Sequence, residues 1–120
     1  MAKAEVHLLL ELTIHDGQFE SFQAVANEMI AGTQGEAGTM AYEWFLSGDP
    51  KHCRLLESYA TVDALLAHLT GPVVQQLVPK MMQYVAIDRS QVYGDPGPEA
   101  AKILASFGAP IFHYWAGLDR

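Results

Sequence analysis

The sequence has few basic residues, a single cysteine and no long apolar run. Seven Lys and Arg stand against fourteen Asp and Glu, which gives the 120-residue chain a formal net charge of −7. No cluster of cations could follow a phosphate backbone or an anionic bilayer, so neither nucleic acid nor a membrane surface is an expected partner. No apolar run approaches the roughly 20 residues that cross a bilayer.

The lone Cys53 cannot form an intrachain disulfide, and the N-terminal segment reaches Glu11 too early for the apolar core of a signal peptide. These two features predict a cytoplasmic protein. The length fits one domain with a substantial core. Charged residues make up only 18% of the chain, against about a quarter in typical globular domains. We therefore expect a second copy of the chain to cover part of the surface in a homodimer.

Alternation of apolar and polar residues predicts four strands. They cover residues 5–15, 39–47, 53–59 and 84–93. The first strand has one fully apolar face, made by Val6, Leu8, Leu10, Leu12 and Ile14. The second and third strands are joined by the short turn Gly48-Asp49-Pro50, which predicts an antiparallel hairpin.

Apolar residues at three- and four-residue steps predict the helices. One covers 17–31, and the glycine-rich segment 32–38 after it is a loop. The next begins at the N-cap Thr61 and ends before Gly71. A further short helix covers 72–83, and Pro79 must kink or split it.

The order strand, helix, strand occurs twice along the chain. Right-handed crossovers turn this order into an α+β, ferredoxin-like βαββαβ fold, a four-stranded antiparallel sheet with both helices on one face. The other face, with Leu9 and Thr13, is then bare, and we expect two such faces to pack together in the dimer. We divide the chain into a domain at 1–93 and a C-terminal arm at 94–120, with a helix over 98–107 and an apolar end that docks on the domain or on the dimer partner.

Four short motifs lie within residues 38–69. They are Gly38-Thr39, Tyr42-Glu43-Trp44, Glu57-x-Tyr59 and Ala64-x-x-x-His68. Together they resemble the signature of the antibiotic biosynthesis monooxygenase family, and the resemblance covers residues 4–93 as a domain. It implies a dimeric α+β barrel. Several members of the family carry out oxygenation without metal or flavin, and the resemblance implies this reaction as well. In it, a phenol or quinol loses a proton and its anion passes an electron to O2.

The family pattern places the ring of His68 toward the cavity between helix and sheet, where an imidazole could take a phenolic proton near neutral pH. In the alternative, His68 has only a structural role: it is partly buried on its helix and its hydrogen bonds are satisfied. Glu57 lies on an inner strand and needs a partner there. Glu57 is a candidate residue for orienting His68 or for acting as a base with it. The alternative is a purely structural hydrogen bond. We expect His68 and Glu57 to be neighbours, and together they are the candidate catalytic residues.

Three aromatic residues are candidate substrate-binding groups. Tyr42 and Trp44 share one face of their strand, where a phenol and an indole N–H could fix a planar substrate. Alternation alone leaves open whether that face lines the cavity or joins the dimer interface, in which case Phe45 lines the cavity instead. Tyr59 shares a face with Glu57, and its hydroxyl could bind a substrate oxygen or its ring could belong to the core.

The histidines show no metal-binding spacing and the glycines no nucleotide-binding motif, so we expect neither a metal nor a cofactor. The neighbouring His52 and Cys53 point in opposite directions, which predicts an inert thiol. The function that follows is a cofactor-independent monooxygenase acting on a small aromatic phenol or quinol. The alternatives are an isomerase of a small polar or lactone metabolite and a non-catalytic small-molecule-binding protein.

Overall fold

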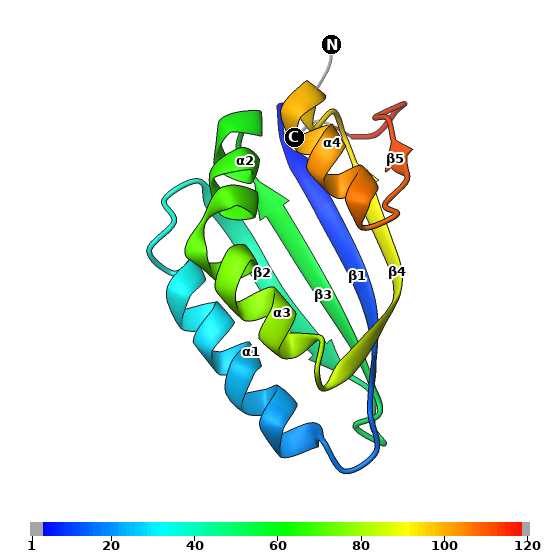
Figure 1. Cartoon of the computed structure of the whole chain (residues 1–120). Helices are drawn as coiled ribbons and strands as arrows, with labels where there is room; N and C mark the ends of the chain where they lie inside the picture. Colours follow the sequence, from blue (N-terminus) through cyan, green and yellow to red (C-terminus); the bar gives the residue numbers. More distant parts are fainter. Residues whose placement is uncertain (1–3, 119–120) are drawn as a thin grey trace.

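The computed structural model describes residues 4–118, and Figure 1 shows a single sheet covered by helices. The predicted elements are present, with their ends moved by one or two residues. In chain order they are β1 (Val6–Ile14), α1 (Phe19–Thr33), β2 (Thr39–Leu46), β3 (His52–Tyr59), α2 (Val62–Thr70), the π-helical turn η1 (Val73–Leu77), α3 (Val78–Met81), β4 (Val85–Tyr93), α4 (Gly97–Ser106) and β5 (Ile111–Phe112).

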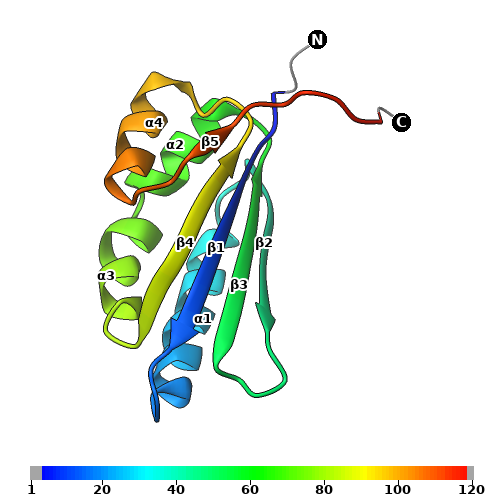
Figure 2. The same ribbon diagram turned by 90° about the vertical axis from the view of Figure 1, so that its right-hand side faces the viewer.

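The sheet has the strand order β2-β3-β1-β4-β5. β1 lies in the middle and pairs antiparallel with both β3 and β4, and β2 pairs antiparallel with β3. This arrangement confirms the predicted ferredoxin-like fold. β5 adds a short fifth strand, parallel to β4, with Val92 opposite Ile111. Figure 2 shows the helices gathered on one side of the sheet.

The alternation in β1 decides which face of the sheet the helices cover. Val6, Leu12 and Ile14 are buried beneath the helices. The opposite face carries Phe45 on β2 and Leu56 on β3, which are 51% and 41% exposed. One face of the sheet therefore forms the core, and the other is open to solvent in a single copy of the chain.

The core consists of two apolar clusters. One lies under α1 and α3 and includes Phe22, Met29 and Met81, and the other lies under α2 and α4 and includes Leu65 and Leu104. Leu10 on β1 and Val78 on α3 pack against both clusters. The middle of β1 is therefore the place where the two halves of the helical layer meet.

The predicted break in the helix over 72–83 is present as a change of helix type. The π-helical turn ends at Leu77, and Pro79 lies at the start of α3. A proline is tolerated there because a backbone N–H has no partner in the first turn of a helix. The predicted N-cap of α2 is also present, with the Ala64 N–H donating to Thr61 Oγ1 at 3.1 Å.

The C-terminal arm lies against the rest of the chain. α4 contacts α2, and β5 extends the sheet beside β4. The rings of Tyr93 and Phe112 are stacked with their centroids 5.6 Å apart. Beyond β5, Trp115 is 94% exposed. Across residues 4–118, none of the helices combines the length and apolar character needed to cross a membrane.

Gly38, at the entry to β2, lets α2 approach the sheet closely. A Cβ at this position would overlap the Cβ of Ala64. We predict that Gly38→Ala lowers the free energy of unfolding by about 1–3 kcal/mol, because the added methyl group forces α2 away from β2. The control is Gly48→Ala, where a Cβ meets no atom within 4 Å and the expected change is within about 0.5 kcal/mol. Equal effects in urea denaturation would contradict the close packing.

Candidate functional site

Glu57 is the only acidic residue among the inward-facing positions of β3. Strand alternation turns Cys53, Leu55, Glu57 and Tyr59 toward the helices. The Glu57 residue is 5% exposed, and Tyr59, two residues further on, donates its hydroxyl proton to Glu57 Oε1 at 2.5 Å. The strand therefore supplies one of the partners that a buried carboxyl group needs.

His68 reaches Glu57 from the helical layer. It lies in the last turn of α2, on the buried side that also carries Leu65 and Leu69. Its Nε2 is 3.5 Å from Glu57 Oε1, so the expectation that the two residues are neighbours is confirmed. The His68 residue is buried, and its ring packs against the rings of Tyr42 and Tyr59, at centroid distances of 5.5 and 5.3 Å.

The other ring nitrogen of His68 contacts Glu36, which the sequence analysis did not predict as a site residue. Glu36 lies in the loop between α1 and β2, and its Oε1 is 2.7 Å from His68 Nδ1. The two residues are 32 positions apart. No periodic pattern includes Glu36, because the glycine-rich segment around it forms no regular element. Its one sequence signal is that it is the acidic residue in that loop.

Burial shifts the proton affinities in the site. Loss of hydration raises the pKa of Glu57, and the neighbouring His68 and the hydrogen bond from Tyr59 oppose this shift. Burial, followed by the charge of Glu57, raises the pKa values of Tyr42 and Tyr59 well above their usual range. Both phenols therefore keep their protons at neutral pH and act as hydrogen-bond donors. Burial also raises the pKa of the Cys53 thiol, in keeping with an inert side chain.

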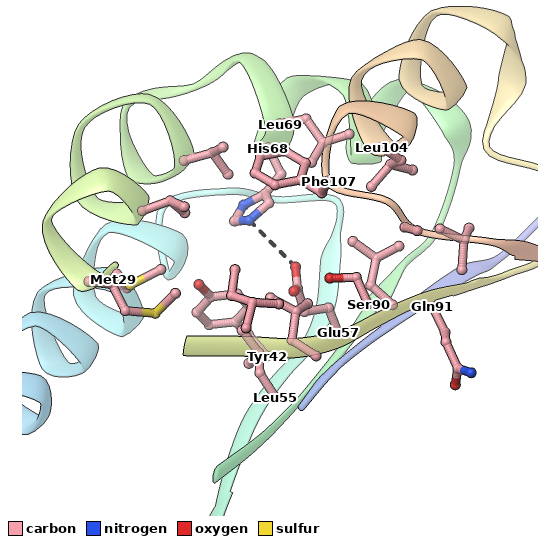
Figure 3. A pocket seen from close by; sticks show the side chains of 18 residues that line it. Met29, Tyr42, Leu55, Glu57, His68, Leu69, Ser90, Gln91, Leu104 and Phe107 are labelled. Atoms are coloured by element: carbon pink, nitrogen blue, oxygen red, sulfur yellow. Dashed lines mark ion pairs between the residues drawn. The ribbon is translucent and has the colours of Figure 1, made fainter. Parts of the chain in front are cut away.

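A cavity of about 60 Å³ lies beside this cluster, at the seam between the two halves of the core. Figure 3 shows His68, Leu104 and Phe107 on its helical side and Tyr42, Leu55, Glu57 and Ser90 on its sheet side. The other lining residues are mostly apolar: Leu8, Leu10, Met29, Leu69, Val74, Val78, Met81, Ile87, Gln91, Val92 and Ala109. The polar groups are thus a minority of the wall.

The structure brings together most of the predicted site residues. The register of β2 on β3 places Tyr42 opposite Glu57, so the face with Tyr42 and Trp44 turns toward the helices and Phe45 faces away. Tyr42 lines the cavity, as do His68 and Glu57. Tyr59 is not among the lining residues and reaches the cavity only through Glu57.

Trp44 lies apart from the cavity, so the substrate-binding role expected for it does not follow from its position. Its indole packs beside Phe22 and Tyr42, at centroid distances of 5.9 and 5.7 Å. It belongs to the edge of the cluster under α1. The reason is the spacing along the strand. Trp44 lies two residues after Tyr42 on the same face of β2, and at that point the face packs against α1 instead of α2.

The arrangement offers proton transfer in an apolar setting. An imidazole and a carboxyl group meet at one wall, the Tyr59 hydroxyl donates to the carboxyl group, and the ring of Tyr42 packs against the imidazole. Low polarity strengthens each of these interactions. Within residues 4–118, no three His, Cys, Asp or Glu side chains are grouped as metal ligands.

Comparisons with known proteins place the chain in a family. The family model described as antibiotic biosynthesis monooxygenase matches residues 5–80. No curated protein matches the sequence.

Solved structures share the fold. The structure of MupZ from Pseudomonas fluorescens has a TM-score of 0.83 at 21% identity, covering 98% of this chain and 96% of that one. That alignment therefore includes α4 and β5. The structure of Rv0793 from Mycobacterium tuberculosis has a TM-score of 0.66 at 20% identity, covering 78% of this chain and 97% of that one. With the family match over more than half its length, the chain belongs to the antibiotic biosynthesis monooxygenase family.

Proposed function

We propose that this protein is a small-molecule monooxygenase that works without a metal or flavin on a phenol or quinol. The observation that carries the proposal is the buried imidazole of His68 at the wall of an apolar cavity, 3.5 Å from the Glu57 carboxyl group. An imidazole so placed can remove the proton of a substrate hydroxyl, and the low polarity around it leaves the resulting anion poorly solvated and reactive. Membership of the family supports the same reaction class.

The other residues of the cluster orient this proton transfer. Tyr42 holds its phenolic proton and can donate it to a substrate oxygen at the cavity wall. Tyr59 donates to Glu57 and thereby fixes the carboxyl group against His68. With a hydroquinone as substrate, the anion passes electrons to O2, one oxygen atom enters the ring and the other leaves as water. The products are a hydroxyquinone and water.

The size of the cavity limits what enters without rearrangement. Its volume of about 60 Å³ is well below the ~150 Å³ of an engineered cavity that holds benzene. A phenol therefore fits only when lining side chains move. Met29 and Met81 contribute unbranched thioether chains, which adapt more readily than branched ones.

The pairing of His68 with Glu57 also supports a second candidate, an isomerase of a small polar or lactone metabolite. A paired base and carboxylic acid can remove a proton from one atom of such a molecule and return it to another without O2. Burial raises the pKa of Glu57, so its carboxyl group holds a proton more readily than a carboxyl group in water does. The two candidates share His68 as the base and differ in their requirement for oxygen.

We predict that the protein consumes O2 with at least one hydroquinone, and that His68→Gln lowers kcat about 100-fold or more, as expected for loss of a general base. Glutamine keeps an amide that can hydrogen bond to one of the neighbouring carboxyl groups, so the fold is retained. The matched control is His15→Gln, in the exposed turn after β1, which leaves the rate unchanged. An oxygen electrode with a panel of hydroquinones measures both.

The contradicting result is metal-free wild-type protein that takes up no oxygen above background with any hydroquinone. In that case the isomerase candidate is tested by proton NMR in D2O. Small carbonyl compounds and lactones are screened for exchange of a carbon-bound proton with deuterium. Exchange that His68→Gln abolishes would support the isomerase, and its absence would leave a binding protein.

A second prediction concerns the pH dependence of stability. Because burial raises the pKa of Glu57 above its ordinary value of 4.5, the folded protein keeps this proton at a pH where the unfolded chain has lost it. The contribution of Glu57 to stability is complete below pH ~4.5 and is lost as the pH rises through the folded pKa. Glu57→Gln mimics the protonated acid, so its stability relative to wild type should increase with pH, by at most about 1.4 kcal/mol per pH unit.

Urea denaturation at several pH values between 5 and 8 measures this difference. Glu20→Gln, at an exposed position of α1, is the control and should give a difference that does not change with pH. A Glu57→Gln difference that is constant, or that falls with rising pH, would mean that the carboxylate stays ionised beside His68.

We further propose that two copies of the chain form a homodimer through the bare face of the sheet. That face combines exposed apolar residues, Phe45 and Leu56, with charged ones that are paired within the chain. Arg54 and Arg89 lie 3.4 and 3.9 Å from the carboxylate of Glu11. Such a mixture of apolar side chains and internally neutralised charges suits an interface between subunits better than a permanently exposed surface.

Sedimentation should give a species of about 26 kDa, twice the chain mass of 13.2 kDa. Leu56→Glu introduces an unpaired charge into the proposed interface and should give the monomer. Met82→Glu, at an exposed position outside the sheet, should leave the dimer intact. A wild-type species of the chain mass at micromolar concentration would end this proposal.

A further inference from the structure

The loop between α1 and β2 brings a carboxylate to the far side of the candidate base. Glu36 Oε1 lies 2.7 Å from His68 Nδ1, the shortest contact that the imidazole makes with a carboxylate. The Glu36 side chain is 22% exposed, whereas that of His68 is 3% exposed. Glu36 therefore keeps part of its hydration while it contacts a ring that has lost nearly all of its own.

The loop holds Glu36 in place through its own hydrogen bonds. The Glu36 N–H donates to the Thr33 carbonyl at 2.9 Å, and the Glu36 carbonyl accepts from the Thr39 N–H at 3.2 Å. The Thr39 hydroxyl donates to Glu36 Oε1 at 3.0 Å. The same carboxylate oxygen thus accepts from Thr39 and contacts the imidazole, which fixes the direction of the carboxylate.

The position of this carboxylate determines where the proton of a neutral imidazole resides. A neutral ring carries one proton, and a carboxylate 2.7 Å from Nδ1 requires an N–H at that atom. The lone pair then lies on Nε2. In Figure 3 this nitrogen points into the cavity and toward Glu57, as the dashed line between the two residues shows.

We propose that Glu36 is a positioning residue that holds His68 in the Nδ1–H form and so leaves the Nε2 lone pair facing the cavity as the base. This inference rests on the proposed function for its catalytic consequence, though not for the tautomer itself. Glu36 is not among the residues that line the cavity, so it acts only through His68. Its contribution is to fix both the tautomer and the ring orientation, as a carboxylate behind a catalytic histidine does in hydrolases.

The test compares three variants. Glu36→Gln keeps the size of the side chain and an acceptor oxygen but removes the charge. Thr39→Val removes the second donor to the Glu36 oxygen and leaves the carboxylate in place. Glu28→Gln, at an exposed glutamate of α1 that pairs with Lys80 at 3.0 Å, is the matched control.

The primary measurement is nitrogen NMR of the ¹⁵N-labelled imidazole of His68 near pH 8, which needs no substrate. Wild type and Glu28→Gln should show the proton on Nδ1. Glu36→Gln should show a mixture of the two tautomers, and Thr39→Val a smaller change in the same direction. A wild-type proton on Nε2 instead of Nδ1, or a Glu36→Gln spectrum equal to wild type, would overturn the positioning role.

The second measurement is turnover with whichever hydroquinone supports oxygen uptake. Glu36→Gln should lower kcat about 10-fold or more and leave KM within about 2-fold, because the substrate does not contact Glu36. A tautomer change without any wild-type oxygen uptake would refute the proposed function and retain the positioning role. An unchanged kcat in a variant whose tautomer has changed would refute the catalytic consequence.

Discussion

The carboxyl group of Glu57 is 5% exposed on a strand whose other inward residues are apolar or aromatic. Left without partners, such a group would cost several kcal/mol of stability. Tyr59 and His68 supply those partners, one from the same strand and one from α2. His68 in turn is buried and needs a partner for its second nitrogen, which Glu36 provides. One buried carboxyl group therefore ties together β3, α2 and the loop before β2.

These linked polar contacts explain where the cavity lies. The polar side chains meet at the seam between the two apolar clusters, beside Leu10, which packs against both. Apolar side chains from either cluster cannot close over the polar groups without breaking their hydrogen bonds. A small unfilled volume therefore remains over the middle of the sheet, where the two clusters meet. In this molecule the requirement to satisfy buried polar groups works against complete packing, and the cavity is the result.

Much of the fold could be predicted from local pattern. The apolar face of β1, the hairpin turn after β2 and the N-cap Thr61 each specify their elements through short-range chemistry, and their order allows few topologies. The outward or inward direction of Tyr42 could not be predicted, because β2 carries aromatic residues on both faces. Only the pairing of Tyr42 with Glu57 across the hairpin decides it.

The candidate site could be predicted only in part, for the same reason. His68 and Glu57 lie on a helix and a strand whose buried faces are readable from periodicity, and their proximity follows from the βα connection. Glu36 lies in a loop, where no repeat relates position to direction, and its contact with His68 depends on how α2 packs across β2. The inward direction of Ser90 does not follow from alternation along its strand, because the pairing of β4 with β1 shifts register beside Leu12. Contacts between loops and helices arise from tertiary packing, which local sequence does not encode.

The division of the cavity wall limits the chemistry of any molecule that occupies it. The polar side chains of His68, Glu57, Tyr42 and Ser90 line one part of the wall, and the remaining lining residues are apolar except Gln91. A charged ligand, or one with polar groups at both ends, would leave at least one group without a hydrogen bond, at a cost of about 1–3 kcal/mol. A molecule with one or two hydroxyl or carbonyl oxygens at one end and hydrocarbon at the other leaves no polar group without a hydrogen bond. A ligand of this kind would place its polar end beside the imidazole that we propose as the base.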